Sequence, residues 1–172
     1  MERIGSKTVY EGQIVDVRID EFSYDDGETA DREIVEHPGA VAIVATDGES
    51  VYLVRQPREA VGDPALLELP AGKLDVEGES PLECAKRELG EEIGMTARGW
   101  SELKRFYTSP GFAEEEVTIF VATELEAIPD HEPDPEERIE VIAWPVSELD
   151  RAIGECFDSK TLIGLLLFSS SR

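Results

Sequence analysis

Hydrophobic and polar residues alternate over residues 8–36, near the start of the chain. In the middle of this stretch the apolar residues are Val15, Val17 and Ile19, and the polar residues between and after them are Asp16, Arg18 and Asp20. This is the period of half-buried β-strands, and the sequence at 25–27, Asp-Asp-Gly, predicts a turn between two of them. The pattern therefore predicts a small antiparallel sheet, which we assign to residues 1–37.

A different pattern begins after a break at His37-Pro38-Gly39. Residues 40–45 are uninterruptedly apolar, which is typical of a strand buried on both faces, and Asp47-Gly48 predicts a hairpin into the next strand. Further along, we predict strands over 51–54, 103–108, 117–123 and 139–144, helices over 146–153 and 158–168, and a polar loop over 126–137. The mixture predicts an α/β (α+β) domain with a mixed central sheet over residues 38–172.

The clearest single element is a helix predicted between Ser80 and Gly94. Ser80 is a favoured N-cap, Pro81 suits the first helical position, and Glu83 completes a Ser-x-x-Glu capping box. Gly94 suits the C-terminal end. The apolar residues of this segment form a stripe that can be buried: Leu82, Ala85, Leu89 and Ile93.

Three carboxylates of this predicted helix, Glu88, Glu91 and Glu92, fall on one side of it, because a helix has about 3.6 residues per turn. Carboxylates so close together repel one another unless a cation lies among them. Hard divalent cations such as Mg²⁺ take oxygen ligands of this kind, usually with substrate phosphates completing the shell. The alternative for such a cluster taken alone is a solvated helix face; with the glycine loop before it, the sequence predicts a site that holds Mg²⁺ against a phosphate.

The composition limits the other possibilities. A chain of 172 residues that is 41% hydrophobic suits one well-buried domain with room for a small appendage. No stretch approaches the ~20 apolar residues of a membrane span, the N-terminus has no signal-peptide pattern, and Cys84 and Cys156 do not make a disulfide framework. These features predict a cytoplasmic protein with reduced thiols.

The formal charge of −23 disfavours binding to nucleic acid or to an anionic membrane, because the long-range field has the wrong sign. We interpret most of this charge as a solvated acidic surface, which is compatible with adaptation to high salt. The alternative is that part of it concentrates cations near the site.

Residues 72–95 resemble the Nudix box, the signature of enzymes that hydrolyse nucleoside diphosphates linked to another group. The family pattern is Gly-x5-Glu-x7-Arg-Glu-U-x-Glu-Glu-x-Gly-U, where U is bulky and aliphatic. From Glu79 through Arg87 to Met95 the sequence matches every defined position. Six residues rather than five separate Gly72 from Glu79, an insertion that falls in the loop before the helix. The resemblance implies a Nudix α/β/α sandwich.

The resemblance also implies roles for individual residues. In related enzymes Mg²⁺, or Mn²⁺ as an alternative, is held by the glutamates matching Glu88 and Glu92, often with the one matching Glu91. The backbone carbonyl matching Ala71 is a further ligand. Arg87 and Glu79 are expected to pair and to fix the loop against the helix.

Features outside the box resemble the ADP-ribose pyrophosphatase branch. A proline, Pro110, lies sixteen residues beyond Gly94, and Glu-Leu-Pro-Ala-Gly at 68–72 follows Arg-Gln-Pro-Arg at 55–58. In that branch a small N-terminal sheet dimerises and an arginine on it reaches the ligand. The substrate-binding residues implied by these matches are Arg32, Arg58, Glu68, Pro110, Gly111 and Phe112.

The implied reaction is hydrolysis of ADP-ribose to AMP and ribose 5-phosphate. The cation neutralises the diphosphate and acidifies a water, and a glutamate in the loop after Pro110 takes the proton. Glu114, Glu115 and Glu116 compete for this role, and alignment of the surrounding residues with relatives favours Glu115. Together with Glu88 and Glu92 it completes the predicted catalytic set.

Alternatives remain open at this stage. The same box serves pyrophosphatases of other nucleoside diphosphate sugars, such as GDP-mannose, and Nudix-like modules that sense ADP-ribose without cleaving it. A homodimer is expected by analogy with the fold. The sequence leaves open the number of metal ions, the phosphorus that is attacked and any exchange of strands between subunits.

Overall fold

The computed structural model describes residues 1–131 and 138–172, and the chain divides into two compact units. The first unit comprises residues 1–39 and 107–116, and the second comprises residues 40–106 and 117–172. The division into domains at residues 37 and 38 stays a prediction. The sequence pattern gave no sign that residues 107–116, which carry the candidate base, pack with the N-terminal strands.

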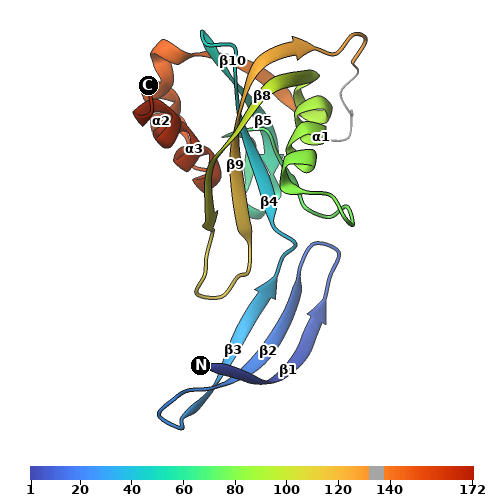
Figure 1. Ribbon diagram of the computed structural model, residues 1–172, viewed down its shortest axis with the longest axis vertical. Helices are drawn as coiled ribbons and strands as arrows, with labels where there is room; N and C mark the ends of the chain where they lie inside the picture. Colours follow the sequence, from blue (N-terminus) through green and yellow to red (C-terminus); the bar gives the residue numbers. More distant parts are fainter. Residues whose placement is uncertain (132–137) are drawn as a thin grey trace. The chain divides into compact units, whose positions relative to one another are not determined.

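The first unit is built on a three-stranded antiparallel sheet in the order β1-β2-β3 (Figure 1). Its strands are β1 (Glu2–Glu11), β2 (Asp16–Ser23) and β3 (Thr29–Glu36). The predicted turn between the second and third strands is confirmed: Gly27 N–H donates to the Tyr24 carbonyl at 2.9 Å, and Gly27 has a φ of 87°, which suits glycine.

Burial within β2 corrects the pattern read from the sequence. The alternation predicted a half-buried strand, and Val17 and Ile19 are half-buried, but the most buried positions are the charged ones: Arg18 is 7% exposed and Asp20 is 0% exposed. The reason is electrostatic, because these two charged side chains lie against each other and against other charged groups, so both are buried as paired charges.

The second unit contains a seven-stranded mixed sheet whose main order is β10-β5-β4-β9-β8, with β6 paired to β5 and β7 to β4. β4 runs parallel to β9 and antiparallel to β5, and every residue of β4 is buried, as the apolar run predicted. The strands are β4 (Ala40–Thr46), β5 (Ser50–Arg58), β6 (Asp63–Glu68), β7 (Ala71–Lys73), β8 (Met95–Tyr107), β9 (Glu116–Ala127) and β10 (Glu140–Pro145).

Helices cover both faces of this sheet (Figure 1). One apolar cluster joins α1 (Pro81–Ile93) to one face through residues such as Leu89 and Ile43. The other cluster joins α2 (Leu149–Glu155) and α3 (Ser159–Ser170) to the opposite face through residues such as Leu165 and Val44. Two short 3₁₀ helices, Glu59–Val61 and Val146–Glu148, connect elements. The predicted α/β/α sandwich with a mixed central sheet is thereby confirmed.

The predicted ends of α1 are also confirmed. The Ser80 Oγ accepts from the Glu83 N–H at 3.3 Å, and the Glu83 carboxylate accepts from the Ser80 N–H at 2.9 Å, so both halves of the capping box are present. Gly94 follows the last helical residue with a left-handed φ of 66°. These caps fix where the helix begins and therefore which way its glutamates face.

Several element boundaries differ from the prediction. Gly72 was expected in a loop but lies in the short strand β7, where it pairs with Val41. β8 and β9 are longer than predicted, so residues 126 and 127 of the expected polar loop belong to β9; residues 132–137 of that loop lie outside the described residues. In the part of the chain that the structure describes, no helix has the length and apolar character needed to cross a membrane.

Candidate functional site

The metal-binding carboxylates predicted on α1 share one side of that helix but differ in exposure. The side chain of Glu88 is 13% exposed and that of Glu91 is 54% exposed, whereas Glu92 as a residue is 6% exposed. The Nη1 of Arg87 donates to Glu88 Oε1 at 2.7 Å and to Glu91 Oε2 at 2.8 Å. One guanidinium nitrogen therefore supplies positive charge between two of the three predicted ligands.

Arg87 also holds the segment before the helix. Its Nε and Nη2 donate to the two carboxylate oxygens of Glu79 at 3.0 and 3.1 Å, a two-pronged geometry that only arginine provides. These hydrogen bonds lower the pKa of Glu79 below its ordinary value, so it stays ionised. The predicted pairing of Arg87 with Glu79 is confirmed.

Backbone atoms of β7 lie directly against these glutamates. A Cβ added to Gly72 would lie 1.9 Å from Glu88 Cδ, so only glycine leaves room for that carboxylate. The neighbouring Ala71 N–H donates to Glu92 Oε2 at 3.0 Å. The structure therefore brings the four residues of the predicted metal set, Ala71, Glu88, Glu91 and Glu92, to the region where β7 meets α1.

This donor set fits a hard divalent cation in its chemistry, since it consists of carboxylate and backbone oxygens beside Gly72, whose lack of a side chain leaves the Glu88 carboxylate in place. Among residues 1–131 and 138–172, no three acidic, cysteine or histidine side chains are gathered closely enough to hold a metal ion. In this arrangement Arg87 is the cation that Glu88 and Glu91 contact.

The first unit holds the other substrate residues predicted from the sequence. Arg32, Pro110, Gly111 and Phe112 all line one cavity of about 260 Å³, together with Tyr24 and other residues of the sheet. The Arg32 Nη2 donates to the Tyr24 hydroxyl at 3.1 Å, and Phe112 is 57% exposed. A guanidinium and aromatic rings around a cavity of this kind suit a flat, partly polar ligand group.

The glutamates competing for the role of base have different surroundings. Glu114 forms an ion pair with Arg18, whose hydrogen bond lowers the pKa of this carboxyl below its ordinary value. Glu115 Oε2 accepts from the Thr108 hydroxyl at 2.7 Å, and its Oε1 lies 3.9 Å from His37 Nε2. Glu116 begins β9.

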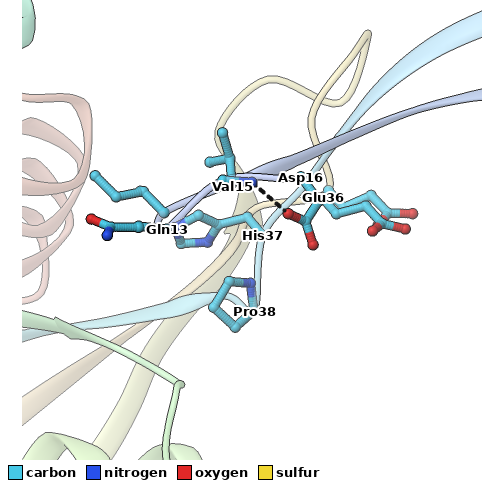
Figure 2. Close-up of a pocket in the computed structure, with 9 residues that line it drawn as sticks. Gln13, Val15, Asp16, Glu36, His37 and Pro38 are labelled. Carbon is cyan, nitrogen blue, oxygen red and sulfur yellow. Dashed lines mark hydrogen bonds between the residues drawn. The ribbon is translucent and has the colours of Figure 1, made fainter. Parts of the chain in front are cut away.

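His37 was interpreted from the sequence as structural or solvated, without catalytic neighbours. Its Nδ1 accepts from the Gly39 N–H at 3.1 Å, which leaves Nε2 toward Glu115. Figure 2 shows His37 next to Glu36 on the wall of a second cavity of the first unit, of about 380 Å³. No sequence signal could have joined it to Glu115, because the two residues are 78 positions apart.

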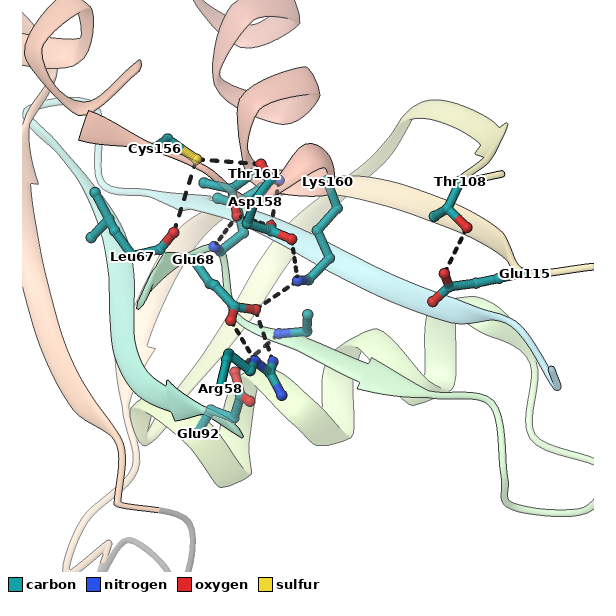
Figure 3. A network of polar contacts seen from close by, with 12 residues as sticks. Arg58, Leu67, Glu68, Glu92, Thr108, Glu115, Cys156, Asp158, Lys160 and Thr161 are labelled. Carbon is teal, nitrogen blue, oxygen red and sulfur yellow. Dashed lines mark hydrogen bonds and ion pairs between the residues drawn. The ribbon is translucent and has the colours of Figure 1, made fainter. Parts of the chain in front are cut away.

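The predicted substrate residues of the second unit form a buried ion-pair cluster (Figure 3). Arg58 donates to the two oxygens of Glu68 at 2.5 and 2.8 Å, and Glu68 is 0% exposed. Lys160 Nζ donates to Glu68 Oε2 at 2.6 Å and to Asp158 Oδ1 at 2.9 Å. Lys160 was missed by the sequence reasoning, which predicted only a helix over 158–168 there.

The positive charges of this cluster keep the Glu68 carboxylate deprotonated. Burial by itself would raise the pKa of Glu68, but the hydrogen bond from Arg58 and the charge of Lys160 bring that pKa below its ordinary value. Glu68 is therefore ionised, and its two oxygens accept hydrogen bonds from Arg58 and Lys160. It orients the guanidinium of Arg58, and the Arg58 side chain is 41% exposed. Figure 3 places Glu92 of α1 close to Arg58, and the charge of Glu92 helps to raise the pKa of Arg58 after the larger effect of Glu68.

The surroundings of the two cysteines disfavour the thiolate form. Both are buried and free. Burial raises the pKa of Cys84 to about 12 and also raises that of Cys156, so both are thiols at neutral pH. This agrees with their interpretation as reduced structural thiols.

Comparisons with known proteins identify the family of this chain. The model of the NUDIX domain matches residues 35–162. An ADP-ribose pyrophosphatase of Bacillus subtilis is 38% identical over 162 residues, which cover 92% of this chain and 86% of that protein. An ADP-ribose pyrophosphatase of Mycobacterium tuberculosis is 41% identical over 169 residues, covering 96% of this chain and 81% of that protein.

One further sequence relative and one solved structure are also similar to this chain. A protein of Bacillus methanolicus named methanol dehydrogenase activator is 36% identical over 166 residues, covering 94% of this chain and 89% of that protein. The crystal structure of an ADP compounds hydrolase superposes with a TM-score of 0.84 at 22% identity, covering 99% of this chain and 92% of that chain, and supports the fold. The chain belongs to the NUDIX family, whose members generally use a divalent metal.

Proposed function

We propose that this protein hydrolyses the diphosphate bond of ADP-ribose in a Mg²⁺-dependent reaction and releases AMP and ribose 5-phosphate. The observation that carries the proposal is the similarity of nearly the whole chain to two ADP-ribose pyrophosphatases, at 38% and 41% identity. The gathering of Arg32, Pro110, Gly111 and Phe112 around one cavity supports it independently.

The metal-binding part of the proposal rests on α1 and β7. Glu88, Glu91, Glu92 and the Ala71 carbonyl would hold Mg²⁺, with Mn²⁺ as an alternative. Such a cation supplies charge neutralisation for the diphosphate oxygens and makes a water more acidic. The close approach of Glu88 to Gly72 and the hydrogen bond from Ala71 to Glu92 support this assignment, because they hold two of the carboxylates in place.

Arg58 is the proposed diphosphate or sugar contact of the second unit. Glu68 fixes its Nε and Nη2, so the guanidinium is oriented while the side chain remains 41% exposed. A fixed guanidinium binds an anionic group at a lower entropic cost than a free one. Glu68, fully buried and shared with Lys160, is proposed to take part in substrate binding by orienting Arg58.

Glu115 is the proposed general base. Glu114 is a weaker candidate, because its carboxylate is bonded to Arg18 and its pKa is lowered, which makes it a poorer proton acceptor. Glu115 accepts hydrogen bonds from Thr108 at its side chain and its backbone, at 2.7 and 3.1 Å, and is therefore well oriented. Arg32 and Phe112, at the cavity of the first unit, are proposed to contact the nucleoside part of the substrate.

The remaining proposals concern the setting of the protein. A homodimer through the N-terminal sheet, a cytoplasmic location and the absence of nucleic-acid or membrane partners stay proposals. The first is supported by the exposed edge strand β1, whose Ile4, Val9 and Tyr10 are each about half exposed, and the last by the charge of −23.

The test is an assay of the purified chain with ADP-ribose and Mg²⁺, with the products separated by chromatography. We expect AMP and ribose 5-phosphate, with activity lost on addition of EDTA and restored by excess Mg²⁺. Hydrolysis confined to other nucleoside diphosphate sugars would support the diphosphate hydrolysis but contradict the assignment of ADP-ribose as the substrate. Tight ADP-ribose binding without hydrolysis would identify a sensor in place of an enzyme.

A further inference from the structure

Arg18 of β2 is the most thoroughly enclosed arginine side chain of the first unit. Its side chain is 8% exposed, and its Nε donates to Asp20 at 2.8 Å. Its two terminal nitrogens both contact Glu114, with Nη1 3.1 Å from Glu114 Oε2, and Nη1 also contacts Glu36. We call these four residues the Arg18 network. It joins β2, β3 and the segment 107–116.

The sheet side of the network is rigidly held. Asp20 is completely buried, and besides Arg18 it accepts from the Ser6 hydroxyl at 2.6 Å and from Arg3 at 3.4 Å. Asp20 therefore holds the Nε end of the guanidinium while it also accepts hydrogen bonds from two residues of β1. The far end of the guanidinium is left to contact Glu36 and Glu114.

The loop side is held by β3 as well. The Val35 N–H donates to the Phe112 carbonyl at 2.8 Å, and the Glu114 N–H donates to the Val35 carbonyl at 3.0 Å. Within the loop, the N–H groups of Phe112 and Ala113 both donate to the Ser109 carbonyl. The segment is therefore an extension of the sheet edge, with the Arg18 contacts as its side-chain anchor.

Burial of an arginine with several carboxylates is a costly way to stabilise a three-stranded sheet. Buried ion pairs are often no more stabilising than apolar residues of similar volume, because both partners lose their hydration. What such a pair does supply is a defined geometry, since an arginine fork admits one orientation of its carboxylate partner. In this unit the carboxylate that Arg18 orients is that of Glu114, which is adjacent in sequence to Glu115.

We propose that Arg18 is a positioning residue, which acts through Glu114 to hold the Glu115 carboxylate in its working place. The inference rests on the proposed function, in which Glu115 is the base. The peptide between Glu114 and Glu115 is fixed on one side by the Arg18 and Val35 contacts, and on the other by Thr108, whose N–H donates to the Glu115 carbonyl at 3.1 Å. Loss of the Arg18 contacts frees one end of this restraint.

The test compares Arg18→Gln with Arg3→Gln in the full chain. Both arginines contact Asp20, but only Arg18 contacts Glu114, so Arg3→Gln is the matched control. We expect Arg18→Gln to lower kcat for ADP-ribose by about 10–100-fold with KM within about threefold, because only the placement of the base is impaired. Arg3→Gln should remain within about twofold of the wild type in both constants.

Two more variants separate positioning from general stability. Glu114→Ala removes only the loop end of the contact and should reproduce the kcat loss at an unchanged melting temperature. The double variant Arg18→Gln/Glu114→Ala should be no slower than the slower single variant, since both changes break one interaction. Arg18→Lys keeps the charge without the fork, so it should fold normally and retain only part of the wild-type kcat.

Amide hydrogen exchange over residues 109–116 supplies the readout that does not depend on turnover. Faster exchange there in Arg18→Gln, together with the kcat loss, supports the inference. Wild-type kcat in Glu114→Ala, or faster exchange with unchanged kcat in Arg18→Gln, would overturn it. If the wild-type protein fails to hydrolyse ADP-ribose, the proposed function is wrong, and the exchange experiment alone then tests the role of Arg18. Unchanged exchange over residues 109–116 in Arg18→Gln would overturn the proposal that Arg18 positions this segment. Faster exchange there would support that proposal.

Discussion

Each of the two units contains an arginine that contacts three carboxylates, and the two arginines differ in how they find their partners. Arg87 of α1 contacts Glu79, Glu88 and Glu91, which are eight, one and four residues away in the sequence. Arg18 of β2 contacts partners that are 2, 18 and 96 residues away. The side chain of Arg87 is 29% exposed and that of Arg18 is 8% exposed.

The difference in sequence separation indicates a different role for the Arg87 contacts and for the Arg18 network. All three partners of Arg87 lie within eight residues of it, on α1 or just before it, so local spacing around a capped helix sets this network. The Arg18 network exists only when β2, β3 and residues 107–116 come together, so it is suited to placing a distant segment. We assign chemistry to the glutamates of α1 and positioning to the Arg18 network.

The largest effect that this comparison predicts is at Glu92, on the chemical side. Glu92→Gln preserves the shape of the side chain but removes a predicted metal ligand, and we expect kcat to fall by about 10³-fold or more. This exceeds the loss expected for any change in the Arg18 network. Steady-state hydrolysis of ADP-ribose measures it, with Glu77→Gln, in the exposed loop before α1, as the control. Equal losses in Glu92→Gln and Arg18→Gln would contradict the assignment of chemistry to the α1 glutamates and of positioning to the Arg18 network.

A smaller effect is expected at Gly72, where the chain approaches Glu88. A Cβ there would meet the end of the Glu88 side chain at 1.9 Å, and that flexible end can move aside. We therefore expect Gly72→Ala to fold normally but to need about 10–100-fold more Mg²⁺ for half-maximal activity. A Mg²⁺ titration of the rate tests this, and Gly154→Ala, whose Cβ meets nothing within 4 Å, is the control. An unchanged Mg²⁺ requirement would remove Glu88 from the metal site.

The smallest effect concerns the acid stability of the Arg18 network. Burial would raise the pKa of Asp20, but hydrogen bonds from Ser6, Arg18 and Arg3 bring it below the ordinary value. A lowered folded-state pKa stabilises the fold above the unfolded value of about 3.9, and this contribution disappears as the pH falls through the lower folded-state value. The deficit in melting temperature of Asp20→Asn should thus be greatest near neutral pH and should narrow below about pH 4.

Thermal unfolding followed by circular dichroism from pH 7 to pH 3 checks this prediction. Asp31→Asn, at an exposed position of β3, serves as the control and should show no such dependence. A deficit in Asp20→Asn that stays constant over the whole range would mean that the pKa of Asp20 is the same in the folded and the unfolded protein, and that its charge does not stabilise the Arg18 network.

The parts of the fold that local chemistry determines could be predicted from the sequence. The capping box at Ser80 and the stop at Gly94 gave the ends of α1, and the apolar run at 40–45 gave the central buried strand. The order of the strands was not predicted, since no local signal specifies that β4 lies beside β9.

The features that the sequence did not predict depend on contacts between residues far apart in the chain. Strand alternation placed Arg18 and Asp20 on a polar side, because their charged partners are supplied by other segments and cannot be read locally. Lys160 escaped notice for the same reason, as its contact with Glu68 spans 92 residues. The roles of the predicted site residues stay predictions, although Arg32, Pro110, Gly111 and Phe112 do share one cavity.

The most direct measurement of the central claim is a competition assay with equal concentrations of ADP-ribose and GDP-mannose in one reaction containing Mg²⁺. The initial ratio of AMP to GMP reports the ratio of the two kcat/KM values, independently of enzyme concentration. Our account predicts that AMP exceeds GMP by about tenfold or more, and that neither forms in EDTA. A ratio near or below one would contradict the assignment of ADP-ribose as the substrate.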